Sequence, residues 1–295
     1  MLTSNLLRSF AWLALSYFSQ QILSPNCAHA QLTIDAINVG EGDSTLVQFN
    51  DESLLVDAGS PMGGALVVKY LRANKIAALK SVIITHPHPD HFAGIFAVLG
   101  LVSVGLIYDN GQSVTDIAKR EDLFRWYTET VRAHKGYTVL AQGDVLKMGT
   151  KNDLVELEVL WPPKNEPLNS DWNNNSLVIK ISNGKFCALL MGDALASTEQ
   201  ALLKFYGSKL QCSVLKAGHH GSAETATPEF LKAVNPKLVL VSVNAANIRG
   251  YPAAKTLARY AAHAKVLVTS DAGNITVNAN SDGSFSTHTQ FRKPK

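Results

Sequence analysis

Three histidines and an aspartate lie within six positions, in the segment His86-Pro87-His88-Pro89-Asp90-His91. The segment follows an apolar, β-branched run over residues 81–84, which is typical of the end of a buried strand. The two prolines favour extended backbone at His86 and His88, so both imidazoles are presented by a stiff segment. Imidazole and carboxylate are the ligands that Zn²⁺ prefers, and imidazole also binds iron and manganese. The pattern predicts a metal centre rather than a solvated His-rich turn.

Two later apolar runs also end in side chains that bind metals. Residues 185–192 predict a buried strand that ends at Asp193. An unpaired carboxylate at such a place is costly, and a bound cation would compensate it, although Asp193 could also cap the helix that follows. Residues 213–217 predict a second strand, which leads into Gly218-His219-His220-Gly221-Ser222. Either His219 or His220 could complete the metal centre, and the other histidine and Ser222 would then face a substrate oxyanion. We favour His219 as the ligand.

The elements that position these residues are interspersed strands and helices. Strands are expected over residues 32–39, 45–49 and 53–57, and the last two form a hairpin. We expect a helix from Asp90 to Leu99, directly after the histidine cluster. A long amphipathic helix is expected over residues 115–134, with these probable core residues: Phe124, Trp126, Tyr127 and Val131.

The N-terminal residues are expected to lie outside this core. Arg8 precedes a short apolar stretch, and Ala28-His29-Ala30 has the small residues of a cleavage site. We therefore expect a secretory signal peptide over residues 1–30 and a mature chain over 31–295, secreted or periplasmic. An uncleaved N-terminal anchor is the alternative. Cys187 and Cys212 lie in apolar runs that favour buried free thiols, although an oxidising compartment would permit a disulfide.

The order of these motifs resembles the metallo-β-lactamase superfamily, whose signature is similar to His-x-His-x-Asp-His at residues 86–91. Further motifs resemble its ComEC-type branch, which is related to the competence protein of DNA uptake. They lie at residues 38–44, 57–59, 173–178 and 218–222. The resemblance implies an α/β fold, the four-layer αββα sandwich of the superfamily, as a single domain over 31–295.

The resemblance also implies a site with two metal ions, most simply zinc, with manganese or iron as alternatives. One ion would be held by His86, His88 and Asp193, and the other by Asp90, His91, Asp193 and His219. Asp90 would also orient the attacking water or shuttle its proton. Asp57 would support the metal from behind, unless it only caps the turn after it. The residues expected to contact substrate are Asn175, Ser176, His220 and Ser222, although Asn175 and Ser176 could equally serve the turn.

One loop departs from the family pattern. The stretch Asn247-Ile248-Arg249-Gly250-Tyr251-Pro252 has no histidine where the family carries its final ligand. Tyr251 or His220 could substitute for it, or one metal position could lose occupancy.

The expected function is metal-dependent hydrolysis of a small-molecule or nucleic-acid phosphodiester. A lactonase or amide hydrolase of the same fold is one alternative, and a metal-binding module of an envelope assembly without enzymatic activity is another. The chain has 27 basic and 24 acidic residues, an excess too small to indicate nucleic-acid binding by itself. Trp161 and Trp172 are the loop residues that could stack on bases.

Overall fold

The computed structural model describes residues 31–151, 153–164, 166, 168 and 170–291. The signal peptide expected over residues 1–30 lies outside these ranges and stays a prediction. Within the described residues, the chain forms an eight-stranded and a seven-stranded sheet. The first sheet has the order β15-β14-β1-β2-β3-β4-β5-β6, and the second has the order β13-β12-β11-β10-β9-β8-β7.

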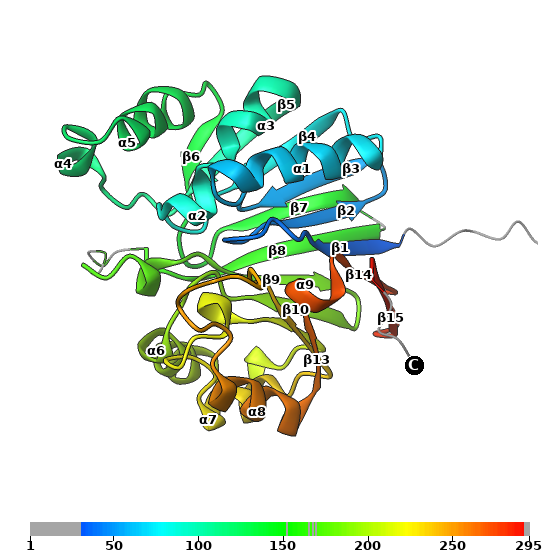
Figure 1. Ribbon diagram of the computed structural model, residues 1–295. Helices are drawn as coiled ribbons and strands as arrows, with labels where there is room; N and C mark the ends of the chain where they lie inside the picture. Colours follow the sequence, from blue (N-terminus) through cyan, green and yellow to red (C-terminus); the bar gives the residue numbers. More distant parts are fainter. Residues whose placement is uncertain (1–30, 152, 165, 167, 169, 292–295) are drawn as a thin grey trace, which may run out of the picture.

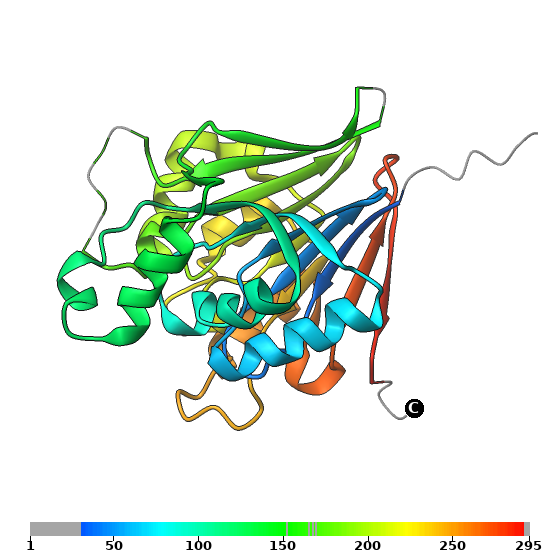
Figure 2. The same ribbon diagram turned by 90° about the horizontal axis from the view of Figure 1, so that it is seen from above.

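The strands of the first sheet are β1 (Leu32–Ala36), β2 (Thr45–Phe49), β3 (Glu52–Val56), β4 (Ala78–Ile83), β5 (Ser103–Asp109), β6 (Tyr137–Val139), β14 (Ile275–Ala279) and β15 (Phe285–Thr289). Those of the second are β7 (Val145–Thr150), β8 (Asp153–Trp161), β9 (Val178–Asn183), β10 (Phe186–Leu190), β11 (Val214–Lys216), β12 (Leu238–Val241) and β13 (Lys265–Val268). The expected hairpin is β2–β3. The C-terminal strands return to the first sheet, where β14 pairs with β1 (Figure 2).

The helices lie mainly on the outer sides of the two sheets (Figure 1). Those on the side of the first sheet are α1 (Pro61–Ala73), α2 (Pro89–Phe92), α3 (Ile95–Leu101), α4 (Thr115–Ala118) and α5 (Asp122–Trp126). Those of the second half are α6 (Ala196–Tyr206), α7 (Pro228–Val234), α8 (Ala254–His263) and the short α9 (Thr269–Ala272). In the part of the chain described, no helix is long and apolar enough to cross a membrane.

Three apolar cores separate the four layers. Because side chains alternate along a strand, Val47 and Phe49 of β2 enter the core between the sheets, while Leu46 enters the core under the first helices. On β9, Ile179 faces the central core, and Val178 faces the core that α6, α7 and α8 cover. This arrangement confirms the αββα sandwich that the family resemblance implies.

The helix expected over residues 90–99 is interrupted at Ala93 and Gly94. Gly94 packs so closely against the chain that a Cβ atom there would lie 1.9 Å from the carbonyl oxygen of Ala58. Its N–H also donates to the carbonyl of Gly59, at 2.8 Å. This tertiary contact overrides the helical pattern and divides it into α2 and α3.

The long helix expected over residues 115–134 is wrong. The extended backbone of Glu121 separates α4 from α5, and a π-helical stretch follows over Tyr127–Arg132. Tyr127 and Phe124 are buried, where both rings pack against Phe92. Trp126 is 50% exposed, so its expected place in the core is also wrong. The change to π-helical winding shifts the faces that a regular helix would present.

Cys187 and Cys212 form a disulfide, so the free thiols favoured from the sequence are wrong. Cys187 lies on β10 and Cys212 lies just before β11, the strand that pairs with β10 in parallel. This pairing brings their Cα atoms to 5.0 Å, which suits a disulfide. The two positions are 25 residues apart, and only the strand order makes them neighbours.

Candidate metal centre

The predicted ligands come from loops at the carboxyl ends of strands in both sheets. The histidine cluster follows β4, Asp193 follows β10, and His219 and His220 follow β11. Neighbouring parallel strands bring their carboxyl ends to one edge, here in each of two packed sheets. The two halves of the chain therefore contribute to one site.

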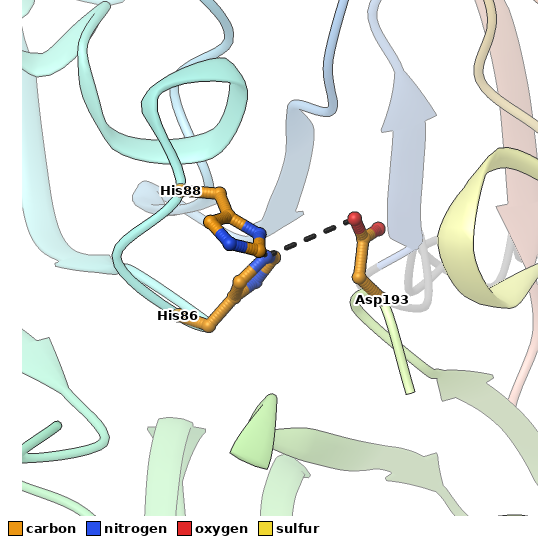
Figure 3. A group of neighbouring side chains, drawn as sticks. All are labelled: His86, His88 and Asp193. Atoms are coloured by element: carbon orange, nitrogen blue, oxygen red, sulfur yellow. Dashed lines mark hydrogen bonds and ion pairs between the residues drawn. The ribbon is translucent and has the colours of Figure 1, made fainter. Parts of the chain in front are cut away.

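A first group consists of His86, His88 and Asp193, each offering a ligand atom within 4.8 Å of the others. Figure 3 shows the two imidazoles on one loop and the carboxylate of Asp193 facing them from the other sheet. The Nε2 atom of His86 lies 3.8 Å from Oδ2 of Asp193 and 2.9 Å from Nδ1 of His88. This is the trio predicted for the first ion.

A second group consists of Asp90, His91 and His220. The Nε2 atom of His220 lies 3.6 Å from Oδ2 of Asp90 and 3.6 Å from Oδ1 of Asp193. The Nε2 atom of His91 lies 3.2 Å from Oδ2 of Asp193. Asp193 thus stands between the two groups, as expected of a bridging ligand.

The geometry favours His220 over His219 in this second group. His219 and His220 both have left-handed backbone, with φ of 41° and 54°, and the centroids of their rings lie 6.0 Å apart. The Nε2 atom of His219 lies 3.9 Å from Oδ2 of Asp193, and its side chain is 12% exposed, against 5% for His220. Left-handed backbone at non-glycine residues is costly and clusters at functional sites.

Hydrogen bonds on the far side of the rings turn three Nε2 atoms toward the site. His91 donates from Nδ1 to Asp57, at 2.8 Å, and His220 donates from Nδ1 to the carbonyl of Ser242, at 3.0 Å. The Thr85 hydroxyl donates to Asp57 at 2.8 Å, so it can accept from Nδ1 of His86, at 3.1 Å. Such bonds fix the tautomer that binds a metal through Nε2. Asp57 thus lies behind His91 and orients its ring, and its support of a bound metal stays a prediction.

Two serines and an asparagine expected to contact substrate are buried. The Ser176 hydroxyl is buried, 3.2 Å from Nδ1 of His86, and it accepts a hydrogen bond from the N–H of Asp193, at 3.0 Å. Ser222 is buried in the turn after His220. The Asn175 amide is buried too, and it donates to Gln112 at 2.6 Å. These positions favour support of the loops over contact with substrate.

The unpartnered atoms of the site fit a metal ion. Among the described side chains, Nε2 of His220 and Oδ1 of Asp193 are buried without a hydrogen-bond partner. Buried polar atoms rarely lack partners, and those that do call for an explanation. A coordinated cation provides one, because imidazole and carboxylate form the donor set of zinc and also of iron or manganese.

The histidines and carboxylates of the site shift one another's pKa values. Burial lowers the pKa of His86 well below its ordinary value, which keeps this ring neutral. Burial also opposes protonation of His91, but the carboxylates of Asp193 and Asp57 outweigh it and raise the pKa of His91 well above its ordinary value. Burial would raise the pKa of Asp193, but charged His91 and His220 hold it well below its usual range. The site thus keeps Asp193 ionised, the form that binds a cation.

A buried ion pair that the sequence analysis missed ties the two halves together. Lys216, at the end of β11, is 2% exposed and pairs with Asp43, which also accepts from the Ser242 hydroxyl at 3.2 Å. The N–H of Asp43 donates to the carbonyl of Asp90 at 3.2 Å. Gly42 permits this approach, because a Cβ atom there would lie 1.8 Å from the same oxygen. The sequence feature that could have revealed this pair is a lysine at the end of an apolar strand.

Aromatic residues form one wall beside the first group. The Trp172 ring lies 5.4 Å from the ring of His88 and 5.9 Å from that of Phe124. Trp161 donates from its indole N–H to the carbonyl of Asn174, at 2.7 Å. Of the two tryptophans considered for stacking, Trp172 is therefore the one whose ring packs on a candidate ligand.

Comparisons with known proteins agree with this geometry. The family profile described as the metallo-beta-lactamase superfamily matches residues 37–243. ComE operon protein 3 of Bacillus subtilis (strain 168) is 26% identical over 285 residues, which cover 90% of this chain and 35% of that protein. Competence protein ComA of Neisseria gonorrhoeae is 28% identical over 235 residues, which cover 79% of this chain and 30% of that protein.

A solved structure shows the same fold. The metallo-beta-lactamase fold protein YhfI of Bacillus subtilis is 17% identical, with a TM-score of 0.50, and the match covers 87% of this chain and 99% of YhfI. The chain spans about a third of the length of the two curated relatives named above. It belongs to the metallo-beta-lactamase superfamily, and the curated proteins to which it is similar include a competence protein.

Proposed function

We propose that the protein is a metal-dependent hydrolase of phosphodiesters, with DNA or a related nucleic acid as the candidate substrate. The observation that carries this proposal is Asp193, whose carboxylate lies between two groups of metal-ligand side chains. Phosphodiester hydrolysis is a reaction that centres with paired metal ions commonly catalyse. The competence proteins among the relatives support a nucleic-acid substrate, although the chain matches only about a third of each.

In this proposal, His86, His88 and Asp193 would hold one ion, and Asp90, His91 and His220 the other. Bound metal would activate a water as nucleophile and stabilise the negative charge that develops on the attacked group. Asp90 is the least buried carboxylate of the site, and it would orient the attacking water and accept its proton. His219 would contact substrate, because this proposal assigns the ligand position to His220 and the His219 side chain is partly exposed.

We further propose a secreted or periplasmic location, with residues 1–30 as signal peptide and 31–295 as mature domain. The disulfide between Cys187 and Cys212 supports an oxidising compartment, because reducing compartments keep cysteine thiols reduced. Export of a fusion of residues 1–30 to a reporter enzyme would test the signal peptide. Retention of the reporter in the cytoplasm would contradict this part of the proposal.

The enzymatic proposal is tested on residues 31–295, purified with added Zn²⁺ or Mn²⁺. We expect metal by elemental analysis and turnover of bis(p-nitrophenyl) phosphate, followed by cleavage of DNA. Asp90→Asn should retain metal through the remaining ligands and lose most of the turnover, because the proton acceptor is gone. Metal binding with hydrolysis of a lactone but not of the phosphodiester would refute the substrate assignment. Full metal binding without any hydrolysis would favour a binding module.

A further inference from the structure

The loop after β12 places the positively charged side chain of Arg249 at the edge of the candidate metal centre. A small cleft opens beside the second ligand group, and its walls include Asp90, His220, Arg249, Tyr251 and Glu41. The ring of Tyr251 lies 5.2 Å from that of His219 and stacks on that of His220 at 6.4 Å. The loop therefore closes one side of the candidate site.

Asn247 holds this loop in shape. Its side-chain N–H group donates to the carbonyls of Asn244 and Tyr251, both at 2.7 Å. Its side-chain oxygen accepts from the N–H of Tyr251, at 2.8 Å. These hydrogen bonds link the two ends of the loop over residues 244–251, so they stabilise the turn that carries Arg249.

The guanidinium of Arg249 is available for a ligand. It lies 3.9 Å from Oδ2 of Asp90 and 3.8 Å from Oε1 of Glu41, and the side chain is 50% exposed. Both distances exceed that of a hydrogen bond, and no described residue forms one with this guanidinium. An arginine has five N–H donors in a planar fork that matches phosphate oxygens. The two carboxylates attract the guanidinium without occupying its donors.

We propose that Arg249 binds an anionic oxygen of the substrate and makes this cleft selective for phosphate esters over neutral esters and lactones. An anion held by the guanidinium would lie next to Asp90 and the unpartnered Nε2 of His220, beside the candidate ligands. The inference rests on the proposed function, because it takes the metal centre as the site of hydrolysis. It assigns a role to the loop in which this chain lacks the histidine of its family.

The test measures binding of inorganic phosphate to the zinc-loaded protein by calorimetry. Arg249→Ala should weaken phosphate binding about tenfold or more, which is the loss expected of a charge-assisted hydrogen bond. The phosphate affinity of Arg249→Lys should lie between those of Arg249→Ala and the unmodified protein. Arg125→Ala is the matched control, because Arg125 is 49% exposed and pairs with Asp122 away from the cleft, and it should bind phosphate as the unmodified protein does. Zinc content should be equal in all of them.

A second variant is expected to change phosphate affinity in the opposite direction from Arg249→Ala. Glu41→Gln removes a negative charge that lies beside the guanidinium and would repel an anion there, so it should tighten phosphate binding. Equal phosphate affinity in Arg249→Ala and Arg125→Ala would overturn the inference, as would loss of zinc in Arg249→Ala. Arg249-dependent phosphate binding without turnover of bis(p-nitrophenyl) phosphate would uphold the inference and refute the proposed function.

If the protein is active, steady-state kinetics distinguish a loss of phosphate selectivity in Arg249→Ala from a general loss of activity. Arg249→Ala should lower kcat/KM for bis(p-nitrophenyl) phosphate at least tenfold more than for a neutral lactone substrate, since only the former presents an anion. An equal loss for both substrates would overturn the selectivity.

Discussion

The buried pair of Lys216 and Asp43 makes a sharp prediction about stability. Lys216→Met keeps the apolar stem of the side chain but leaves the Asp43 carboxylate buried without its cation. Removing one partner of a buried ion pair costs about 3–5 kcal/mol. The Ser242 hydroxyl still donates to Asp43, so we expect a loss near the lower end, about 3 kcal/mol. For a chain of this size, with about 2.1 cal/mol/K of unfolding entropy per residue, this corresponds to about 5 °C in melting temperature.

The assay is denaturant unfolding of the metal-free protein, followed by circular dichroism. The matched control is Lys80→Met, because Lys80 pairs with Glu52 at 2.7 Å but has a side chain that is 39% exposed. Exposed pairs contribute only about 0–1 kcal/mol, so the control should change little. A second variant, Asp43→Asn with Lys216→Met, should recover part of the loss, because it leaves no unpaired charge.

The pair should also affect the metal centre, because the backbone of Asp43 binds the carbonyl of Asp90. We therefore expect weaker metal binding in Lys216→Met than in Lys80→Met, measured by competition with a chromophoric chelator. The reasoning is refuted if Lys216→Met is no less stable than the control. It is also refuted if the double variant is less stable than Lys216→Met alone.

Three further predictions concern the ligands and the disulfide. Asp193→Ala should lose more metal in elemental analysis than His88→Ala, because Asp193 adjoins both groups, and equal losses would contradict a bridging role. His220→Ala should lose metal while His219→Ala retains it and loses turnover; the opposite result would return His219 to the ligand set. Cys187→Ser should destabilise the protein by about 3.5 kcal/mol, the chain-entropy value for a loop of this length, in unfolding experiments without reductant. A Cys187→Ser variant as stable as the unmodified protein would show that the disulfide contributes little.

The sequence predicts those parts of the site that depend on local chemistry. His86, His88, Asp90 and His91 lie within six positions, and the prolines favour extended backbone at His86 and His88, so the cluster can be recognised from the sequence alone. Asp193 was found because a carboxylate that ends an apolar strand needs a partner. Apolar and alternating runs likewise predicted β1 to β4, β10 and β11.

The rest depends on contacts between distant segments. The pairing of Lys216 with Asp43 joins positions 173 residues apart, and no local sequence pattern predicts that these two residues are in contact. The choice between His219 and His220 depends on two residues with left-handed backbone, which the sequence does not specify. The interruption at Gly94 arises from its contact with Ala58, which lies beside it only after the sheet has formed.

The place of β1 between β2 and β14 has a consequence for how the chain folds. The N–H of Asn38, just after β1, bonds to the side chain of Asn274, 236 positions later. A chain made from its N-terminus must therefore leave one edge of β1 unpaired until β14 emerges, and contacts of such long range form slowly. An unpaired strand edge recruits other chains. A chain that ends before residue 274 should aggregate rather than fold, even though every candidate ligand would be present.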